Sequence, residues 1–450
     1  MRYGEGKSII IVGAGLAGAL LACALGERGY RVRVFERRPD PRAKGFIGGR
    51  SINLALSVRG IDALKRVGLD RVVMKDAIPM RGRVLHDPLG GTAFQAYSKD
   101  GKDAINSISR GGLNLTLANE AEKHPNVTLH FAHRCEDVDL DAPSATFSVD
   151  DPNGTRLETV HADAIFGTDG AFSAVRTRMQ KQDRFDYDQS YLAHGYKELH
   201  IPPTSSGEFA MEPNALHIWP RGGSMMIALP NPDKSFTCTL FWPFDGPHSF
   251  ANLRTRDEVR AFFEREYKDA VPMMPTLVDD FISNPTSSLV TVRCWPWRHA
   301  AKVCILGDAA HAIVPFYGQG MNCAFEDVAC LIDMLDAEQG DLAKVLPRFE
   351  AARKQNADAI ADMALENFIE MRDKVASPWF RLKKKAEHAL EAILPGVYRS
   401  LYTMVSFSTI PYAKARARAR KQSSIIRGTV VAIAFAAAIT LLALGLSMGR

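Results

Sequence analysis

The sequence predicts an α/β protein in which a Rossmann-like dinucleotide-binding domain is interrupted by an antiparallel β-sheet domain and followed by C-terminal helices and a transmembrane helix. Three observations favour this fold: a strand–glycine–helix–strand segment near the N-terminus, short β-like runs with Pro and Gly between them from about 185 to 300, and a long uncharged stretch near the C-terminus. Because 450 residues are too many for one hydrophobic core, we expect at least two domains.

The N-terminal segment has the features of a dinucleotide-binding unit. A β-branched apolar run, typical of a buried parallel strand, is followed by Gly13, Gly15 and Gly18 in G-x-G-x-x-G spacing. In this motif the first glycine allows a tight turn, the second lets the backbone approach a pyrophosphate, and the third lets helix and strand pack closely. The helix that follows offers free N–H groups to the phosphates. Glu36 ends the second strand, where it can accept hydrogen bonds from a ribose 2′-OH, which favours FAD or NAD over NADP.

Further apolar runs indicate that the chain returns to this first domain. The runs at 164–167 and 303–306 predict buried parallel strands on either side of the β-rich region. The expected division is a discontinuous dinucleotide-binding domain at 1–75, 105–180 and 300–340, a substrate β-sheet domain at 76–104 and 181–299, a helical region at 341–425 and a transmembrane anchor at 428–449.

Charge and cysteine content exclude several classes of partner. The net charge is +5, and the basic residues at 414–421 account for all of it, so the rest of the chain is neutral and shows no nucleic-acid-binding surface. None of the seven cysteines lies in a C-x-x-C pair or in a Cys/His spacing typical of metal sites. We therefore expect no nucleic acid, no metal and no disulfide bond.

The stretch 428–449 has no charged residue and is rich in Ala, Leu, Ile and Val, which is long enough for a helix that crosses a bilayer. Core helices of soluble proteins usually keep a polar face, and this stretch has none. The basic run before it fits the positive-inside rule. We therefore expect the body of the protein in the cytosol, anchored to a bacterial inner membrane or a mitochondrial outer membrane.

Two further motifs complete the pattern of an FAD site. Asp169 lies in GTDGAFSAVR, and Asp308 lies in ILGDAAHAIVPFYGQGMNCAFED, where its carboxylate can reach a ribityl hydroxyl. The Gly-rich turn in the second motif begins a helix at Met321 and Asn322, and the helix N-terminus can stabilise negative charge on the reduced flavin ring. We expect His311 to be a structural histidine that is hydrogen-bonded to backbone.

The three motifs, in this order, resemble the flavoprotein aromatic hydroxylases, which share one FAD domain interrupted by a β-sheet substrate domain. The runs GRSINLALSVRG, MRGRVLH, ENFIEMRDKVASP and LYTMVSFSTIPY, with the second motif above, resemble the kynurenine 3-monooxygenase family along nearly the whole chain. The uncharged tail resembles the membrane-anchored members of that family. The resemblance implies FAD as the cofactor and NADPH and O2 as co-substrates. A second nucleotide motif is absent from the sequence, as in that class.

The motifs and the resemblance together give a set of candidate site residues. The expected FAD-binding residues are Gly13, Gly15, Leu16, Gly18, Glu36, Arg110, Cys135, Thr168, Asp169, Asp308, Gly320, Met321 and Asn322. The resemblance implies that Arg83 and Tyr97 bind the amino-acid carboxylate of L-kynurenine, and that Asn367, Tyr402 and Glu370 complete the pocket. Without the resemblance, Arg83 would be assigned to the surface of a hairpin. Tyr317 lies in the ring-pocket loop, where family members vary between Phe and His.

The resemblance also implies a reaction. L-kynurenine would be hydroxylated to 3-hydroxykynurenine through a C4a-hydroperoxyflavin, in tryptophan catabolism and the synthesis of NAD by way of quinolinate. Because the ring amine donates electrons to the ortho carbon, no side chain is expected to act as a nucleophile. The protein would supply orientation, exclusion of water and a proton source.

The sequence leaves three alternatives open. One is an FAD monooxygenase acting on another aromatic or a lipid-like substrate, although an arginine in the pocket argues against an all-apolar substrate. A second is an FAD-dependent reductase or dehydrogenase, which would usually carry a second nucleotide motif or a redox Cys pair; the sequence has neither. A third is a membrane-tethered flavoprotein that serves as a binding module without turning over NADPH.

Overall fold

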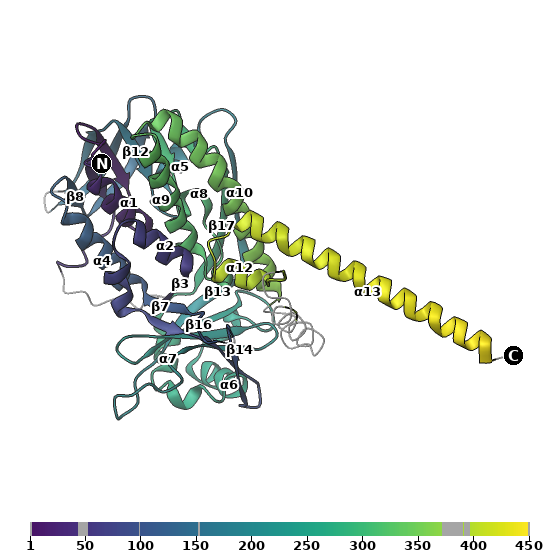
Figure 1. Cartoon of the computed structure of the whole chain (residues 1–450). Helices are drawn as coiled ribbons and strands as arrows, with labels where there is room; N and C mark the ends of the chain where they lie inside the picture. Colours follow the sequence, from purple (N-terminus) through teal and green to yellow (C-terminus); the bar gives the residue numbers. More distant parts are fainter. Residues whose placement is uncertain are drawn as a thin grey trace.

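The computed structural model describes residues 2–43, 53–98, 100–151, 154–370, 390 and 397–448, and within the last helix it describes side chains only to Thr429 and at Ala432. Figure 1 shows a body with two main sheets and helices around them, from which the C-terminal helix extends away as one long rod. Much of the predicted helical region between 371 and 396 lies outside the described residues.

The dinucleotide-binding part is built on a six-stranded sheet in the order β18-β19-β12-β1-β2-β8. Neighbouring strands are parallel except for β18 and β19, as expected for buried, β-branched strands. The strands of this sheet are β1 (Ser8–Val12), β2 (Arg31–Phe35), β8 (Val127–His130), β12 (Ala164–Gly167), β18 (Arg298–His299) and β19 (Val303–Ile305). The predicted return of the chain at 164–167 and near 303 is therefore confirmed.

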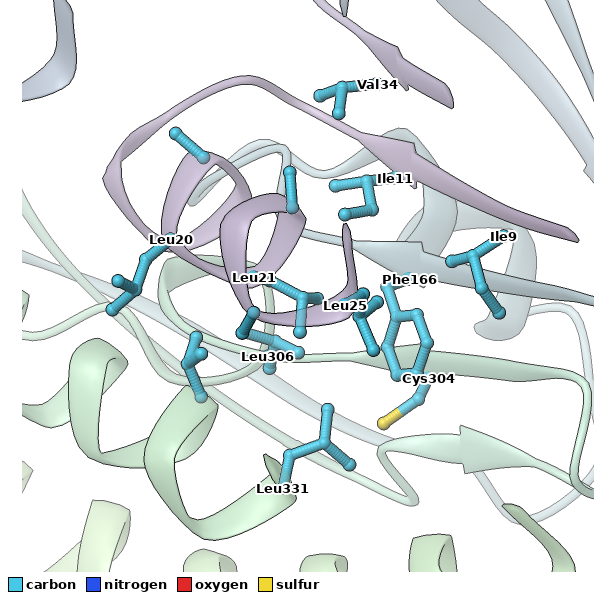
Figure 2. Packing of buried hydrophobic residues seen from close by; sticks show 14 of the residues in the cluster. Ile9, Ile11, Leu20, Leu21, Leu25, Val34, Phe166, Cys304, Leu306 and Leu331 are labelled. Carbon is cyan, nitrogen blue, oxygen red and sulfur yellow. The ribbon is translucent and has the colours of Figure 1, made fainter. Parts of the chain in front are cut away.

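Helices surround this sheet. They comprise α1 (Leu16–Glu27), α2 (Val58–Arg66), α3 (Asp70–Val73), α4 (Arg110–Glu122), α5 (Ala174–Met179), α8 (Asp308–His311), α9 (Gly320–Ala337) and the short 3-10 turn η1 (Met74–Asp76). Of these, α1, α4 and α5 contact the strands of the sheet directly. Figure 2 shows Leu20, Leu21 and Leu25 of α1 packed among β1 residues and Leu331 of α9. Because α1 is surrounded by the sheet, α4 and α9, most of its residues are buried and it has no polar face.

Two small antiparallel sheets flank the first. One has the order β11-β10-β9 and the other the order β3-β7-β4. Their strands are β9 (His133–Asp139), β10 (Ser144–Asp151), β11 (Gly154–His161), β3 (Asn53–Leu56), β7 (Ile105–Ser109) and β4 (Ile78–Met80). In the second sheet, β4 of the predicted substrate domain pairs with β7 of the predicted dinucleotide-binding domain.

The β-rich region forms a seven-stranded sheet in the order β17-β13-β16-β15-β14-β5-β6. Its strands are β5 (Gly82–His86), β6 (Thr92–Ala96), β13 (Asp186–Ile201), β14 (Ala215–Pro220), β15 (Met225–Pro230), β16 (Phe236–Pro243) and β17 (Ser287–Trp295). The expectation of a purely antiparallel sheet is wrong at one place, because β14 and β5 are parallel. The β5–β6 hairpin comes from a separate part of the chain, so its direction is not set by a hairpin connection to β14.

One face of this sheet is covered by α6 (Arg256–Glu266), α7 (Leu277–Ser283) and two 3-10 turns, η2 (Phe250–Asn252) and η3 (Val271–Met273). Trp219, Phe236, Leu240, Phe263 and Phe281 form the core between them. Side chains alternate between the two faces of a strand, so the other face is left for the cavity described below.

The C-terminal helices pack against α9. They are α10 (Leu342–Ile369), α12 (Leu401–Ser406) and α13 (Tyr412–Met448). Buried residues of all four helices, among them Cys323, Ile360, Val405 and Tyr412, form one cluster. The C-terminal region is thus part of the folded body as far as the start of α13.

The predicted transmembrane helix is not supported by the structure. In the part of the chain that the structure describes, no helix is long and apolar enough to span a membrane. The portion of α13 with described side chains includes the basic run at 414–421, and most side chains of 428–449 lie outside the described residues.

Candidate active site

A cavity of about 590 Å³ lies where the carboxyl ends of β1, β2 and β12 meet the open face of the seven-stranded sheet. Residues from both sheets, from the start of α1 and α9 and from α12 line it. The carboxyl edge of a parallel sheet is where such folds bind nucleotides. Among the expected site residues, Gly13, Gly15, Leu16, Glu36, Arg83, Tyr97, Arg110, Cys135, Thr168, Asp169, Asp308, Gly320, Met321 and Tyr402 line the cavity.

The glycine turn at the start of α1 is closely packed on one side and open on the other. Gly13 has a φ of +98°, and a Cβ on Gly18 would lie 2.0 Å from the carbonyl oxygen of Gly13, so both positions require glycine. At Gly15, by contrast, the nearest heavy atom to a Cβ would be 4.0 Å away. No side chain caps α1, whose first N–H groups are left for a ligand such as a pyrophosphate.

Two polar side chains fix the geometry of this turn. The Thr168 hydroxyl donates to the carbonyl oxygens of Val12 and Gly13, at 2.9 and 2.8 Å. Glu36 accepts a hydrogen bond from the backbone N–H of Ala14 at 3.0 Å, which places its carboxylate at the cavity wall beside the glycines. That position suits a contact with a ribose, as the sequence predicts.

The acidic residues of the two later motifs differ in their surroundings. The Asp169 carboxylate accepts hydrogen bonds from the Ser173 hydroxyl and the Ala174 N–H at the start of α5. Burial raises the pKa of Asp169 even though these hydrogen bonds act to lower it. Asp308 is exposed at the cavity wall and follows Gly307, whose φ is +61°.

Arg110 and Cys135 line the cavity in different ways. Arg110 is exposed at the first position of α4. Cys135 lies half-buried on β9, and burial raises the pKa of its thiol, so the thiol stays protonated at neutral pH.

The turn before α9 approaches the cavity with its backbone. Gly318 takes the left-handed conformation, and no side chain caps the N-terminus of α9. The Asn322 side chain is fully buried and does not line the cavity: its amide donates to the carbonyl oxygens of Ala55 and Gly318, and its oxygen accepts from the N–H of Ser57. The Asn322 side chain therefore holds the turn in place.

A buried charge cluster behind the cavity was missed by the sequence analysis. Asp327 on α9 accepts hydrogen bonds from the Gly307 N–H at 3.0 Å and from Arg353 Nε at 2.6 Å, and its Oδ2 lies 2.5 Å from His311 Nε2. The prediction that His311 bonds to backbone is therefore wrong. Burial acts to raise the pKa of Asp327, but the positive charges of His311 and Arg353 prevail and lower it to about 2.

His311, Cys323 and Asp327 are close enough together to hold a metal ion. Arg353 already donates to Asp327 Oδ1 and to the Cys323 carbonyl oxygen, and its fixed charge would repel a cation. We therefore assign this group to the charge cluster that holds the Gly307–Asp308 turn.

An arginine between aromatic rings closes the far end of the cavity. Arg83 extends from β5, with its guanidinium carbon 4.3 Å from the ring centre of Tyr402 and 5.6 Å from that of Tyr97. Both Arg83 Nε and the Tyr97 hydroxyl are buried without a hydrogen-bond partner among the described residues. An unsatisfied buried donor costs about 1–3 kcal/mol, so this end of the cavity fits a ligand with hydrogen-bond acceptors.

Between Arg83 and the turn before α9 the walls are mostly apolar. Residues of β14, β15, β16 and the 3-10 turn η4 (Pro315–Tyr317) face this space. They include Leu216, Ile218, Met225, Ile227, Phe241 and Phe316. Thr239 of β16 is the polar exception, with a buried hydroxyl that has no partner in the described chain. The lining residues lie two apart along each strand, so the alternation of side chains between the two faces was the signal that could have predicted this wall.

The remaining expected pocket residues lie next to the cavity. Asn367 on α10 donates to the Phe316 carbonyl oxygen at 2.6 Å, which supports the η4 turn. Tyr317 lines the cavity and stacks on Tyr402 with ring centres 5.9 Å apart. Glu370 follows the last residue of α10, close enough to Tyr317 to raise the pKa of that phenol, to a smaller extent than burial and Tyr402 do.

Comparisons with known proteins agree with this geometry. A family model described as an FAD-binding domain matches residues 7–364. The kynurenine 3-monooxygenase of Myxococcus xanthus is 49% identical over 92% of this chain and 89% of the relative, and that of Dictyostelium discoideum is 49% identical over 91% and 90%. The chain belongs to the kynurenine 3-monooxygenase family. It is thus an FAD-dependent monooxygenase.

Solved structures share the fold at lower identity. 2-Methyl-3-hydroxypyridine-5-carboxylic acid oxygenase matches with a TM-score of 0.66 and 20% identity, covering 83% of this chain and 95% of the other. PqsL of Pseudomonas aeruginosa matches with a TM-score of 0.64 and 21% identity, covering 82% and 97%. The cavity suits FAD, because two uncapped helix N-termini, a glycine without near neighbours and two exposed or half-exposed carboxylates lie along it.

The glycine turn makes a testable prediction. Gly18→Ala forces a Cβ against the Gly13 carbonyl, so the free energy of unfolding of the protein without FAD should fall by about 1–3 kcal/mol. Gly15→Ala, the matched control, should keep that stability and weaken FAD binding, because its Cβ points into open space. Thermal unfolding and FAD titration measure the two effects. Equal stability of Gly18→Ala and the unmodified protein would contradict the packing described here.

Proposed function

We propose that this protein hydroxylates L-kynurenine to 3-hydroxykynurenine, with NADPH and O2 as co-substrates, in tryptophan catabolism and the synthesis of NAD by way of quinolinate. The observation that carries the proposal is a pair of buried donors at the far end of the cavity, Arg83 Nε and the Tyr97 hydroxyl, which have no hydrogen-bond partner among the described residues. The 49% identity to two kynurenine 3-monooxygenases supports the same substrate.

The Arg83 guanidinium lies over the rings of Tyr402 and Tyr97, and its Nε has no hydrogen-bond partner among the described residues. A guanidinium that stacks on Tyr402 uses its flat face, and its N–H groups point outward in the plane. A carboxylate matches that fork with two parallel hydrogen bonds, and the Tyr97 hydroxyl adds a third donor. The amino-acid end of kynurenine provides this carboxylate.

The apolar walls suit the other end of the substrate. Leu216, Ile227, Phe241 and Phe316 give an aromatic ring a surface to pack against between Arg83 and the turn before α9. A ligand held by its carboxylate at one end and by its ring at the other has little freedom to rotate. This orientation is what places the ring carbon next to the amine toward the flavin side of the cavity.

The chain's own residues bind, orient and shield the substrate. FAD, when bound, supplies the electrons taken from NADPH and the activation of O2. The walls around Phe241, Phe316 and Tyr317 exclude water from the ring. Burial raises the pKa of Tyr317, so its phenol stays protonated and can donate a hydrogen bond inside the cavity. No side chain is needed as a nucleophile, because the ring amine activates the carbon beside it.

Turnover tests the proposal directly. The FAD-loaded protein should oxidise NADPH faster when L-kynurenine is added, and the product should be heavier by one oxygen atom in mass spectrometry. The D-enantiomer, which presents the same groups in the wrong arrangement, is the matched control and should give less stimulation. NADPH oxidation without an oxygenated product would keep the flavoprotein assignment and overturn the substrate.

The location of the protein is a separate part of the proposal. The uncharged stretch 428–449 and the basic run before it support attachment to a membrane with the body in the cytosol. Removal of residues 428–450 should shift the protein from the membrane pellet to the supernatant after ultracentrifugation of lysed cells. Replacement of the exposed Lys414, Arg420 and Lys421 by Gln is the control that separates surface charge from the uncharged stretch, since it leaves the Arg416 ion pairs with α10 in place. A full-length chain found in the supernatant would contradict the attachment.

A further inference from the structure

Arg59 is a buried arginine whose contacts play no part in the site described above. It lies in the first turn of α2 and is 1% exposed. Its Nε donates to the Val405 carbonyl oxygen at 2.8 Å, and its Nη2 donates to the carbonyl oxygens of Met404 and Ile410 at 3.3 and 2.5 Å. Nη1 pairs with Glu326 of α9 at 2.6 Å. The three carbonyl oxygens that accept these hydrogen bonds belong to α12 or the loop after it.

The carbonyl groups of Met404 and Val405 lie in the last turn of α12, and that of Met404 also accepts a hydrogen bond from the Ser408 hydroxyl at 2.6 Å. The last carbonyl groups of a helix have no partner within the helix, and α12 has only six residues. A helix of this length is not stable alone. A positive charge at its C-terminal end also interacts favourably with the helix dipole. Arg59 therefore fixes the end of α12, the helix that carries Tyr402 into the pocket.

The same guanidinium also contacts the start of α13. Its carbon lies 4.0 Å from the ring centre of Tyr412, which is fully buried. The Tyr412 hydroxyl donates to Gln319 Oε1 at 2.9 Å, and Gln319 directly precedes α9 in the turn that faces the flavin end of the cavity. One arginine and one tyrosine thus connect the substrate end of the cavity to its flavin end.

The two segments that carry Arg59 and Tyr412, the start of α2 and the start of α13, are each held by a further hydrogen bond. The start of α2 is fixed by the hydrogen bond from the Ser57 N–H to Asn322 Oδ1, at 3.0 Å. The first turn of α13 is fixed by the hydrogen bond from the Ala413 N–H to Asn356 Oδ1 of α10, also at 3.0 Å. Because both segments are held, a shift of Arg59 or Tyr412 is expected to move Tyr402 and Gln319 as well.

We infer that Arg59 and Tyr412 form a latch that sets the positions of Tyr402 at the substrate carboxylate and of Gln319 at the turn before α9. They are positioning residues, because neither lines the cavity. The latch makes the start of the C-terminal helix part of the active-site structure. With the latch loosened, the Tyr402 ring no longer holds the Arg83 guanidinium, and the ring of the substrate is held less well relative to the flavin. This inference rests on the proposed function in taking L-kynurenine as the substrate.

Arg59→Lys and Tyr412→Phe test the latch. Lysine keeps the charge but loses the planar fork, so the KM for L-kynurenine should rise about tenfold or more, and more NADPH should be oxidised per hydroxylated product, while FAD stays bound. Tyr412→Phe keeps the ring under Arg59 and removes only the bond to Gln319. It should alter the visible absorption spectrum of the bound flavin and lower the product formed per NADPH, with a smaller effect on KM.

Arg66→Lys is the matched control. Arg66 lies on the same helix and also pairs with α9, through Asp333. It is exposed, and its other ion pair is with Asp62 of its own helix. It should leave KM, coupling and flavin spectrum unchanged. If both Arg59→Lys and Tyr412→Phe lose thermal stability but keep KM, coupling and spectrum, the role is merely structural and the inference is overturned. Absence of kynurenine turnover in the unmodified protein would contradict the proposed function, and the flavin spectrum of Tyr412→Phe would still test the latch.

Discussion

A hydrogen-bond donor taken out of water and left without an acceptor destabilises a protein, and two donors at one end of the cavity have no acceptor among the described residues. Arg83 Nε and the Tyr97 hydroxyl are both buried and unpaired in the described chain. The rest of the substrate end depends on this constraint: Tyr402 and Tyr97 stabilise the guanidinium through their ring faces, and α12 must stay in place to keep Tyr402 there. Under the proposed function, the carboxylate of the substrate supplies the missing acceptor.

At the flavin end, by contrast, the buried polar side chains of Asp327 and Asn322 have hydrogen-bond partners. Asp327 binds Gly307, His311 and Arg353 at once, and Asn322 binds Ala55, Gly318 and Ser57. Backbone N–H groups at helix N-termini are left free to meet a phosphate or an anionic ring. The cavity therefore has turns held by hydrogen bonds at the flavin end and, at the other end, buried donors that have no partner in the described chain.

Sequence patterns predicted what depends on local geometry. The glycine spacing identified Gly13 and Gly18, where no Cβ fits, and apolar runs identified β1, β12 and β19 as parallel strands. Patterns could not predict contacts between distant segments. The β5–β14 pairing is parallel and joins separate parts of the chain, and the partner of His311 is a carboxylate sixteen residues away on another helix. Asn322 follows the expected turn but faces away from the cavity, which spacing alone does not reveal.

The most direct measurement of the central claim is a binding titration that removes the carboxylate from the ligand and, separately, the guanidinium from the protein. The FAD-loaded protein and Arg83→Met are titrated with L-kynurenine and with its decarboxylated amine, and the change in flavin absorbance reports binding. The account predicts that the unmodified protein binds L-kynurenine at least about tenfold more tightly than the amine and that Arg83→Met loses this preference. Equal affinity of the unmodified protein for both compounds, or a preference that survives in Arg83→Met, would contradict it.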